Sequence, residues 1–126
     1  MAKVMIVATT GVPHSAVFID YKDIKYRDKW ISFEPGSHFT NGKVVEWSFE
    51  VENAITFDIP DTVVARAEKQ VVEQYTDSFY FIGVRDCVSF SADFARYCNL
   101  MTTTANMTPY GFILGLSYYN QYEVFN

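Results

Sequence analysis

The sequence is short of the residues that most cofactor and metal sites require. Among its 126 residues there are two cysteines and two histidines, with neither a Cys-x-x-Cys nor a His-x-x-x-His pair that would indicate a structural zinc site. The glycine-rich loops that hold phosphates and dinucleotides are missing, as is the Gly-x-Ser-x-Gly motif of serine hydrolases. We therefore predict neither a cofactor nor a metal ion.

Positive charge is also scarce. Ten basic residues stand against fifteen acidic ones, which gives a net charge of −5. Because nucleic acids and anionic lipids select basic surfaces, this balance argues against either as the main partner. The N-terminal apolar run Val4-Met5-Ile6-Val7-Ala8 is too short for an export signal or a membrane span. We expect a cytoplasmic protein, or one delivered elsewhere by a separate secretion machinery.

Apolar residues, by contrast, are abundant, at 49% of the chain with 17% aromatic. This richness excludes intrinsic disorder, and the length fits a single domain over residues 1–126. Runs rich in β-branched and aromatic residues, bounded by Gly, Pro or Asn, predict strands. They lie at residues 4–9, 15–19, 30–34, 43–51 and 54–59.

After Pro60 the apolar positions change to helical spacing. We predict one helix that starts after Asp61 as its cap, a second from 86 to about 99, and a short third over 110–116. The segment 79–84 is either a strand or an extended lead-in, and the basic segment 21–29 is a solvated hairpin loop. The predicted fold is α+β, with an antiparallel sheet from the N-terminal half packed against helices of the C-terminal half.

The two cysteines occupy opposite ends of the predicted second helix. Eleven residues of helix separate Cys87 from Cys98 by about 16 Å, too far for a disulfide. Cys87 follows Asp86 in the first turn, where free amides and the helix dipole favour a thiolate, the form that acts as a nucleophile. Cys98 would experience the opposite field. The alternative interpretation of Cys87 is a small buried apolar group.

A cysteine nucleophile needs a general base, and both histidines precede Cys87. His14 ends a Gly-Val-Pro turn that opens a strand, where a rigid scaffold can orient a side chain. His38 lies in a surface turn. Either histidine can instead be structural. Glu50 and Glu52 alternate along a predicted strand and are most simply a solvated face.

These residues together resemble the circularly permuted NlpC-type papain-like hydrolases over about residues 12–100. The similarity consists of the strand Pro13-His14-Ser15-Ala16-Val17-Phe18-Ile19, the strand Ile31-Ser32-Phe33-Glu34-Pro35, Tyr80, and the helix start Asp86-Cys87-Val88-Ser89-Phe90. Lecithin retinol acyltransferase and the PPPDE peptidases are similar, more distantly, in their His-then-Cys order.

The resemblance implies that Cys87 is a nucleophile with His14 as its base, and that amides at the helix start hold the oxyanion. Asp86 departs from the Asn usual in that family, and its carboxylate would disfavour the thiolate. Glu34 is the candidate for the third residue that orients the histidine, with Ser32 and His38 as alternatives. Implied substrates are a peptide, a peptidoglycan fragment or an acylated molecule.

Two other functions remain open at this level. The scaffold can serve as a non-catalytic interaction module, which Asp86 and the aromatic, nearly uncharged C-terminal tail favour. If the tail is exposed, its patch predicts a homodimer or another partner. The same two catalytic residues would also suit an acyltransferase with a lipid or amine acceptor.

Overall fold

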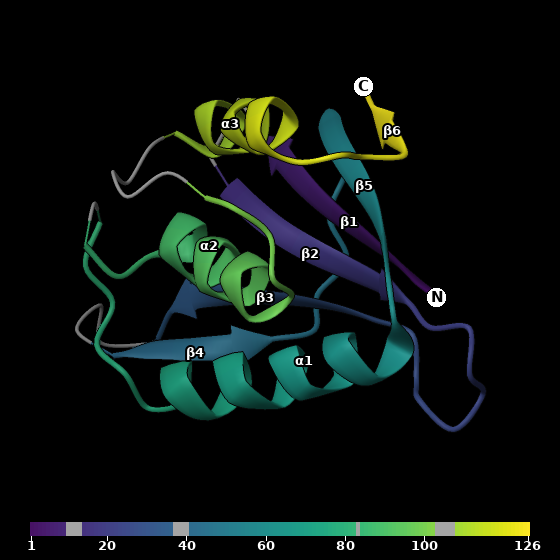
Figure 1. Ribbon diagram of the computed structural model, residues 1–126. Helices are drawn as coiled ribbons and strands as arrows, with labels where there is room; N and C mark the ends of the chain where they lie inside the picture. The colour runs from purple at the N-terminus through teal and green to yellow at the C-terminus, as the bar shows by residue number, and fades with distance from the viewer. Residues whose placement is uncertain (10–13, 37–40, 83, 103–107) are drawn as a thin grey trace.

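The computed structural model describes residues 1–9, 14–36, 41–82, 84–102 and 108–126 (Figure 1). Within this part of the chain, the strands form one antiparallel sheet in the order β4-β3-β2-β1-β5-β6. Their bounds are β1 (Ala2–Thr9), β2 (His14–Asp20), β3 (Lys29–Pro35), β4 (Gly42–Val45), β5 (Asn53–Ile59) and β6 (Val124–Phe125).

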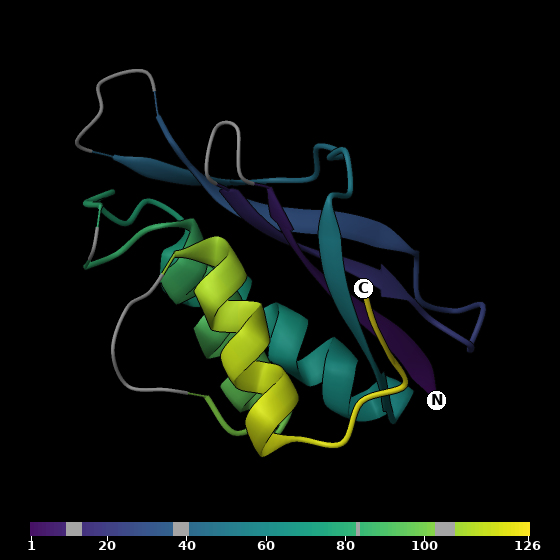
Figure 2. The ribbon, with the colours of Figure 1, turned by 90° about the horizontal axis from the view of Figure 1, so that it is seen from above.

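All three helices of the described chain cover the same face of the sheet (Figure 2). They are α1 (Asp61–Tyr75), α2 (Cys87–Tyr97) and α3 (Pro109–Tyr119). The α+β class is therefore confirmed. The division between an N-terminal sheet and C-terminal helices holds with one exception, β6, which the sequence did not predict. The last residues return to the sheet, where Asn126 donates from its backbone to Ala54 at 2.9 Å.

The main core lies between the sheet and the helices. Alternate residues of β1, such as Val4 and Ile6, have no exposed surface and face it. Aromatic rings fill its centre, with Tyr75 in edge contact with Phe33 at 4.9 Å and with Phe90 at 5.2 Å between ring centroids. Each side chain buried this completely contributes about 1.5–3 kcal/mol, so this cluster holds α1 and α2 against the sheet.

On the opposite face of the sheet, the segment between β4 and β5 packs on a small apolar cluster. Its strand was predicted to run over residues 43–51, but β4 ends at Val45 and residues 46–52 are irregular. The apolar alternation that predicted a strand has another cause here. The side chain of Phe49 packs on a small cluster of Val7, Ala16 and Ala54. The strand prediction was wrong for residues 46–51 because Phe49 buries its side chain by packing on the sheet face rather than by pairing as part of a strand.

The start of α1 and the segment before α2 both differ from what the sequence predicted. Asp61 does not cap α1, because Pro60 takes the N-cap position and makes no side-chain cap bond. The Asp61 carboxylate instead accepts from the backbone N–H of Asp23 at 2.6 Å. In segment 79–84, the described residues form isolated bridges at Phe79 and Phe81 and a turn in which Val84 N–H donates to Phe81 at 3.0 Å, so they are neither a strand nor an extended lead-in. Among the described helices, none has the length and apolar character required to cross a bilayer.

Candidate functional site

Two neighbouring strands bring His14 and Glu34 together. In the β2–β3 ladder Val17 pairs with Ile31, and continuing this antiparallel register places His14 directly opposite Glu34. His14 Nε2 lies 2.9 Å from Glu34 Oε1. Both side chains are largely buried, at 11% and 17% exposed, so the carboxylate and the imidazole interact with little competition from water.

The start of α2 positions Cys87 as the first helical residue. Asp86 is the N-cap, and its Oδ1 accepts from the backbone N–H groups of Val88 and Ser89, each at 3.0 Å. The Ser89 hydroxyl accepts in return from the Asp86 N–H at 2.6 Å, which completes a capping box. This reciprocal pair fixes where the helix begins and therefore where the thiol of Cys87 is placed.

The thiol of Cys87 and the imidazole of His14 interact where the start of β2 lies near the start of α2. Burial lowers the pKa of His14, but hydrogen bonds and charge interactions with Cys87 and Glu34 outweigh it and raise the pKa from 6.5 to about 9. The structure thus brings together all three residues selected from the sequence. The arrangement therefore favours the imidazolium form of His14 beside the sulfur of Cys87.

Phe49 holds the imidazole from its other side. Its ring stacks on His14 with 4.3 Å between centroids and 29° between planes. The sequence pattern placed Phe49 in a strand, and no local motif marks its contact with His14. The stack covers one face of the imidazole and restricts rotation of the ring.

Tyr80 lies near the thiol of Cys87, and no role for it was predicted from the sequence. The backbone of Cys87 hydrogen-bonds to its hydroxyl and lowers the pKa of Tyr80, but burial and the nearby charges of Cys87 and Asp86 raise it more strongly. The phenol therefore remains protonated at neutral pH. Its ring packs on Phe33 at 5.3 Å between centroids, which holds the hydroxyl at the start of α2.

Cys98, at the other end of α2, has a different environment. Both cysteines are free, as expected from their separation along the helix. Burial raises the pKa of the Cys98 thiol to about 12, and no charged group contributes to that shift. A thiol in such surroundings stays protonated and is a weak nucleophile.

A cleft of about 350 Å³ opens beside His14 and Glu34. The other residues that line it come from the end of β1 and from the irregular segment: Thr9, Trp47, Phe49, Glu50 and Glu52. Glu50 and Glu52 are exposed as predicted, but they lie on this segment rather than on a strand. His38, an alternative partner for the imidazole, lies outside the described residues.

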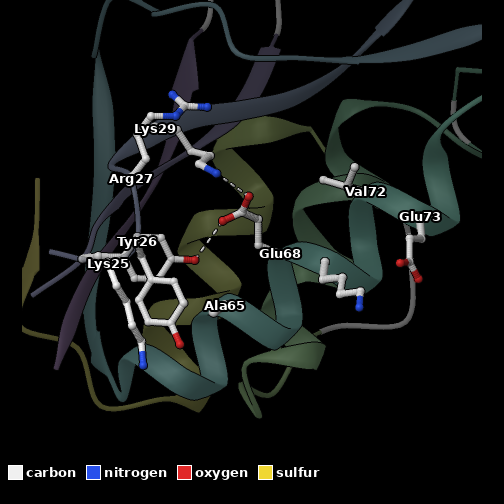
Figure 3. Close-up of a pocket in the computed structure, with 10 residues that line it drawn as sticks. Lys25, Tyr26, Arg27, Lys29, Ala65, Glu68, Val72 and Glu73 are labelled. Atoms are coloured by element: carbon white, nitrogen blue, oxygen red, sulfur yellow. Dashed lines mark hydrogen bonds and ion pairs between the residues drawn. The ribbon is translucent and has the colours of Figure 1, made fainter. Parts of the chain in front are cut away.

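A larger cavity of about 500 Å³ lies at the other end of β2, between the 21–29 loop and α1 (Figure 3). The carboxylate of Glu68 accepts from the Tyr21 hydroxyl at 2.8 Å and from Lys29 Nζ at 2.7 Å. The charged ends of Lys25 and Arg27 point in opposite directions (Figure 3). Because its buried acid is already paired and these two cations diverge, this cavity is not the candidate site.

In the part of the chain that the structure describes, no group of three His, Cys, Asp or Glu residues could hold a metal ion. Comparison of the chain with protein-family models, with curated proteins and with solved structures found no match. Functional inference therefore depends on the geometry of Cys87, His14 and Glu34.

Proposed function

We propose that the protein is a thiol hydrolase, a peptidase or amidase, on a permuted papain-like scaffold. Cys87 is the nucleophile, His14 is its acid and base, and Glu34 orients the imidazole. The observation that carries the proposal is that Cys87 lies close enough to His14 to raise the pKa of the imidazole, with Glu34 Oε1 2.9 Å from Nε2 of the same ring. Nucleophilic catalysis requires this arrangement, in which a base contacts the nucleophile and a third group orients the base.

The chemistry proceeds in two steps. The sulfur of Cys87 attacks the carbonyl carbon of an amide, and His14 donates its proton to the departing amine, which leaves an acyl-enzyme thioester. His14 then takes a proton from water, the resulting hydroxide attacks the thioester, and the sulfur leaves to restore the resting pair. Glu34 stabilises the positive ring in the resting state and sets its orientation.

The developing oxyanion needs hydrogen-bond donors beside the sulfur. The Val88 and Ser89 amides are already used by the Asp86 carboxylate, and the backbone of Cys87 interacts with the Tyr80 hydroxyl, so each of the first three amides of the helix already has a partner. We assign the oxyanion donor to the Tyr80 hydroxyl, which the raised pKa of Tyr80 keeps protonated.

The substrate class follows from the chemistry only in part. A peptide, a peptidoglycan fragment or an acylated molecule each offers a carbonyl to this thiol, and an acyltransferase would differ only in replacing water with a lipid or amine acceptor. Free thiols suit a reducing compartment. We place the activity in the cytoplasm, or wherever a delivery machinery takes the protein.

The decisive experiment compares matched cysteine variants. Wild type, Cys87→Ala and Cys98→Ala are incubated with peptide amides, isopeptides, thioesters and peptidoglycan fragments, and product is measured by mass spectrometry. We expect Cys87→Ala to lose at least about 1,000-fold in rate, as removal of a nucleophile does, with its circular dichroism unchanged. Cys98→Ala should remain active. Equal activity of Cys87→Ala and wild type would reject the proposal.

A second candidate function is an interaction module that binds a second copy of the chain through its C-terminal aromatic residues. Tyr118 is 76% exposed, and Tyr119 and Tyr122 are also exposed. Sedimentation at increasing concentration tests this candidate. A dimer that dissociates on the double substitution Tyr118→Ser and Tyr119→Ser would support it, and a monomer at all concentrations would exclude it.

A further inference from the structure

We propose that Ser15 and Ser91 are positioning residues for the Cys87–His14 pair, a role that rests on the proposed function and deepens it. Their hydroxyls form a direct hydrogen bond of 2.8 Å, in which Ser15 donates to Ser91. Ser15 adjoins His14 in β2, and Ser91 lies one helical turn beyond Cys87 in α2. The bond therefore joins the strand that carries the base to the helix that carries the nucleophile.

The placement of the two serines follows from the periodicity of their elements. Neighbouring residues of a strand point to opposite faces, so Ser15 is directed towards α2 from the position next to His14. Residues i and i+4 of a helix lie on one face, which puts Ser91 on the same side of α2 as Cys87. The link is therefore adjacent to the reacting groups without touching the substrate.

Because the Ser15–Ser91 hydrogen bond is buried, it constrains how β2 and α2 lie relative to each other. Neither Ser15 nor Ser91 has any exposed surface. A buried hydroxyl that loses its partner costs roughly 1–3 kcal/mol, because no water replaces the bond. Apolar packing between β2 and α2 tolerates small sliding movements, whereas a hydrogen bond has a defined length and direction. Misplacement of reacting groups by about 1 Å can lower a rate about 100-fold, so such a constraint matters for the dyad.

The two ends of the link are not equivalent. If Ser15 loses its hydroxyl, Ser91 can still bond to the backbone carbonyl of Cys87 four residues earlier, as helical serines commonly do. If Ser91 loses its hydroxyl, Ser15 has no such substitute in a strand. We therefore expect Ser91→Ala to have the larger effect of the two.

The test measures how fast iodoacetamide alkylates Cys87 as a function of pH, in a Cys98→Ala background so that one thiol reports. We expect Ser15→Ala to slow alkylation about 3-fold and Ser91→Ala about 10-fold, with the pH dependence of each rate changed from that of the parent protein. The double alanine variant should be no slower than Ser91→Ala, because the shared bond is already lost. Ser91→Thr, which keeps a hydroxyl, should restore the rate to within about 2-fold.

Val64→Ala is the matched control, because Val64 is fully buried in α1 and forms part of the same core. It lowers stability without removing the link between β2 and α2. If the serine variants alkylate at the wild-type rate, or if the two single effects multiply in the double variant, the positioning role is wrong. If Cys87 in the parent protein reacts no faster than a cysteine in an unfolded peptide, the proposed function itself fails.

Discussion

The two ends of α2 carry the same residue type in different chemical surroundings. Cys87 and Cys98 are almost equally buried, at 6% and 4% exposed. Cys87 is surrounded by an imidazole, a phenol and a capped helix start, whereas only burial shifts the pKa of Cys98. The exposed fraction of a thiol therefore does not distinguish a reactive cysteine from an inert one. The polar groups that surround the thiol make that distinction.

The most direct test of the difference between Cys87 and Cys98 is to label both thiols in the native protein. A thiol with a pKa of about 12 is almost entirely protonated at neutral pH. We expect iodoacetamide to modify Cys87 at least about 1,000-fold faster than Cys98, measured by peptide mass spectrometry. In urea the two rates should converge, since the difference belongs to the fold. Equal native rates would remove the basis of the contrast.

The pH dependence of stability sharpens the comparison further. Because the pKa of His14 is raised from 6.5 to about 9, its contribution to stability is complete below pH 6.5 and disappears as the pH rises through about 9. We expect the free energy of unfolding to fall by about 1–3 kcal/mol over that window, allowing for partial solvent screening. Urea titrations at several pH values provide the measurement.

The cysteine variants supply the control for this titration. Cys87→Ala removes one partner of the imidazolium and should reduce the pH dependence, while Cys98→Ala should leave it unchanged. His14→Gln should remove this contribution entirely. A Cys98→Ala variant with the smaller pH dependence would indicate that the protonation effect lies elsewhere.

Substitutions at Asp86 distinguish the effect of helix capping from the effect of negative charge at the Cys87 end of α2. Asp86→Ala loses the bonds to Val88 and Ser89 and should destabilise the protein by about 1 kcal/mol. Asp86→Asn keeps an N-cap side chain and should stay within about 0.5 kcal/mol of wild type, yet alkylate faster because a negative charge next to the thiolate is gone. A slower Asp86→Asn would show that the carboxylate assists the thiol.

The smallest effect is expected at the Cys98 end. Asn99 follows that cysteine with a φ of 68°, a left-handed conformation that glycine adopts without penalty. Asn99→Gly should change the free energy of unfolding by no more than about 0.5 kcal/mol and leave Cys87 labelling unchanged. A change in Cys87 labelling would mean that the two ends of the helix are coupled.

The sequence predicted those features that depend on local pattern. Strand and helix periods placed most elements correctly, and Asp86-Cys87 marked a helix start because capping chemistry involves residues only two or three apart. The pairing of His14 with Glu34 followed from resemblance, and the register of β2 and β3 supplies its geometric reason.

The remaining features depend on contacts between distant residues. The ring of Phe49 reaches His14 only because residues 46–52 cross the outer face of the sheet, and β6 forms only because the end of the chain returns to β5. The Ser15–Ser91 bond spans 76 positions. None of these contacts leaves a periodic signal along the chain.

The capping box at Asp86 has one more consequence, which concerns selectivity. The beginning of a helix ordinarily attracts phosphate or carboxylate ligands, because its amides point outwards without partners. Here the chain supplies that anion itself, since the carboxylate of Asp86 already takes the amides of Val88 and Ser89. An acidic group on an incoming molecule would meet an occupied position beside a carboxylate, so we expect such molecules to bind less well at this end of α2 than neutral ones.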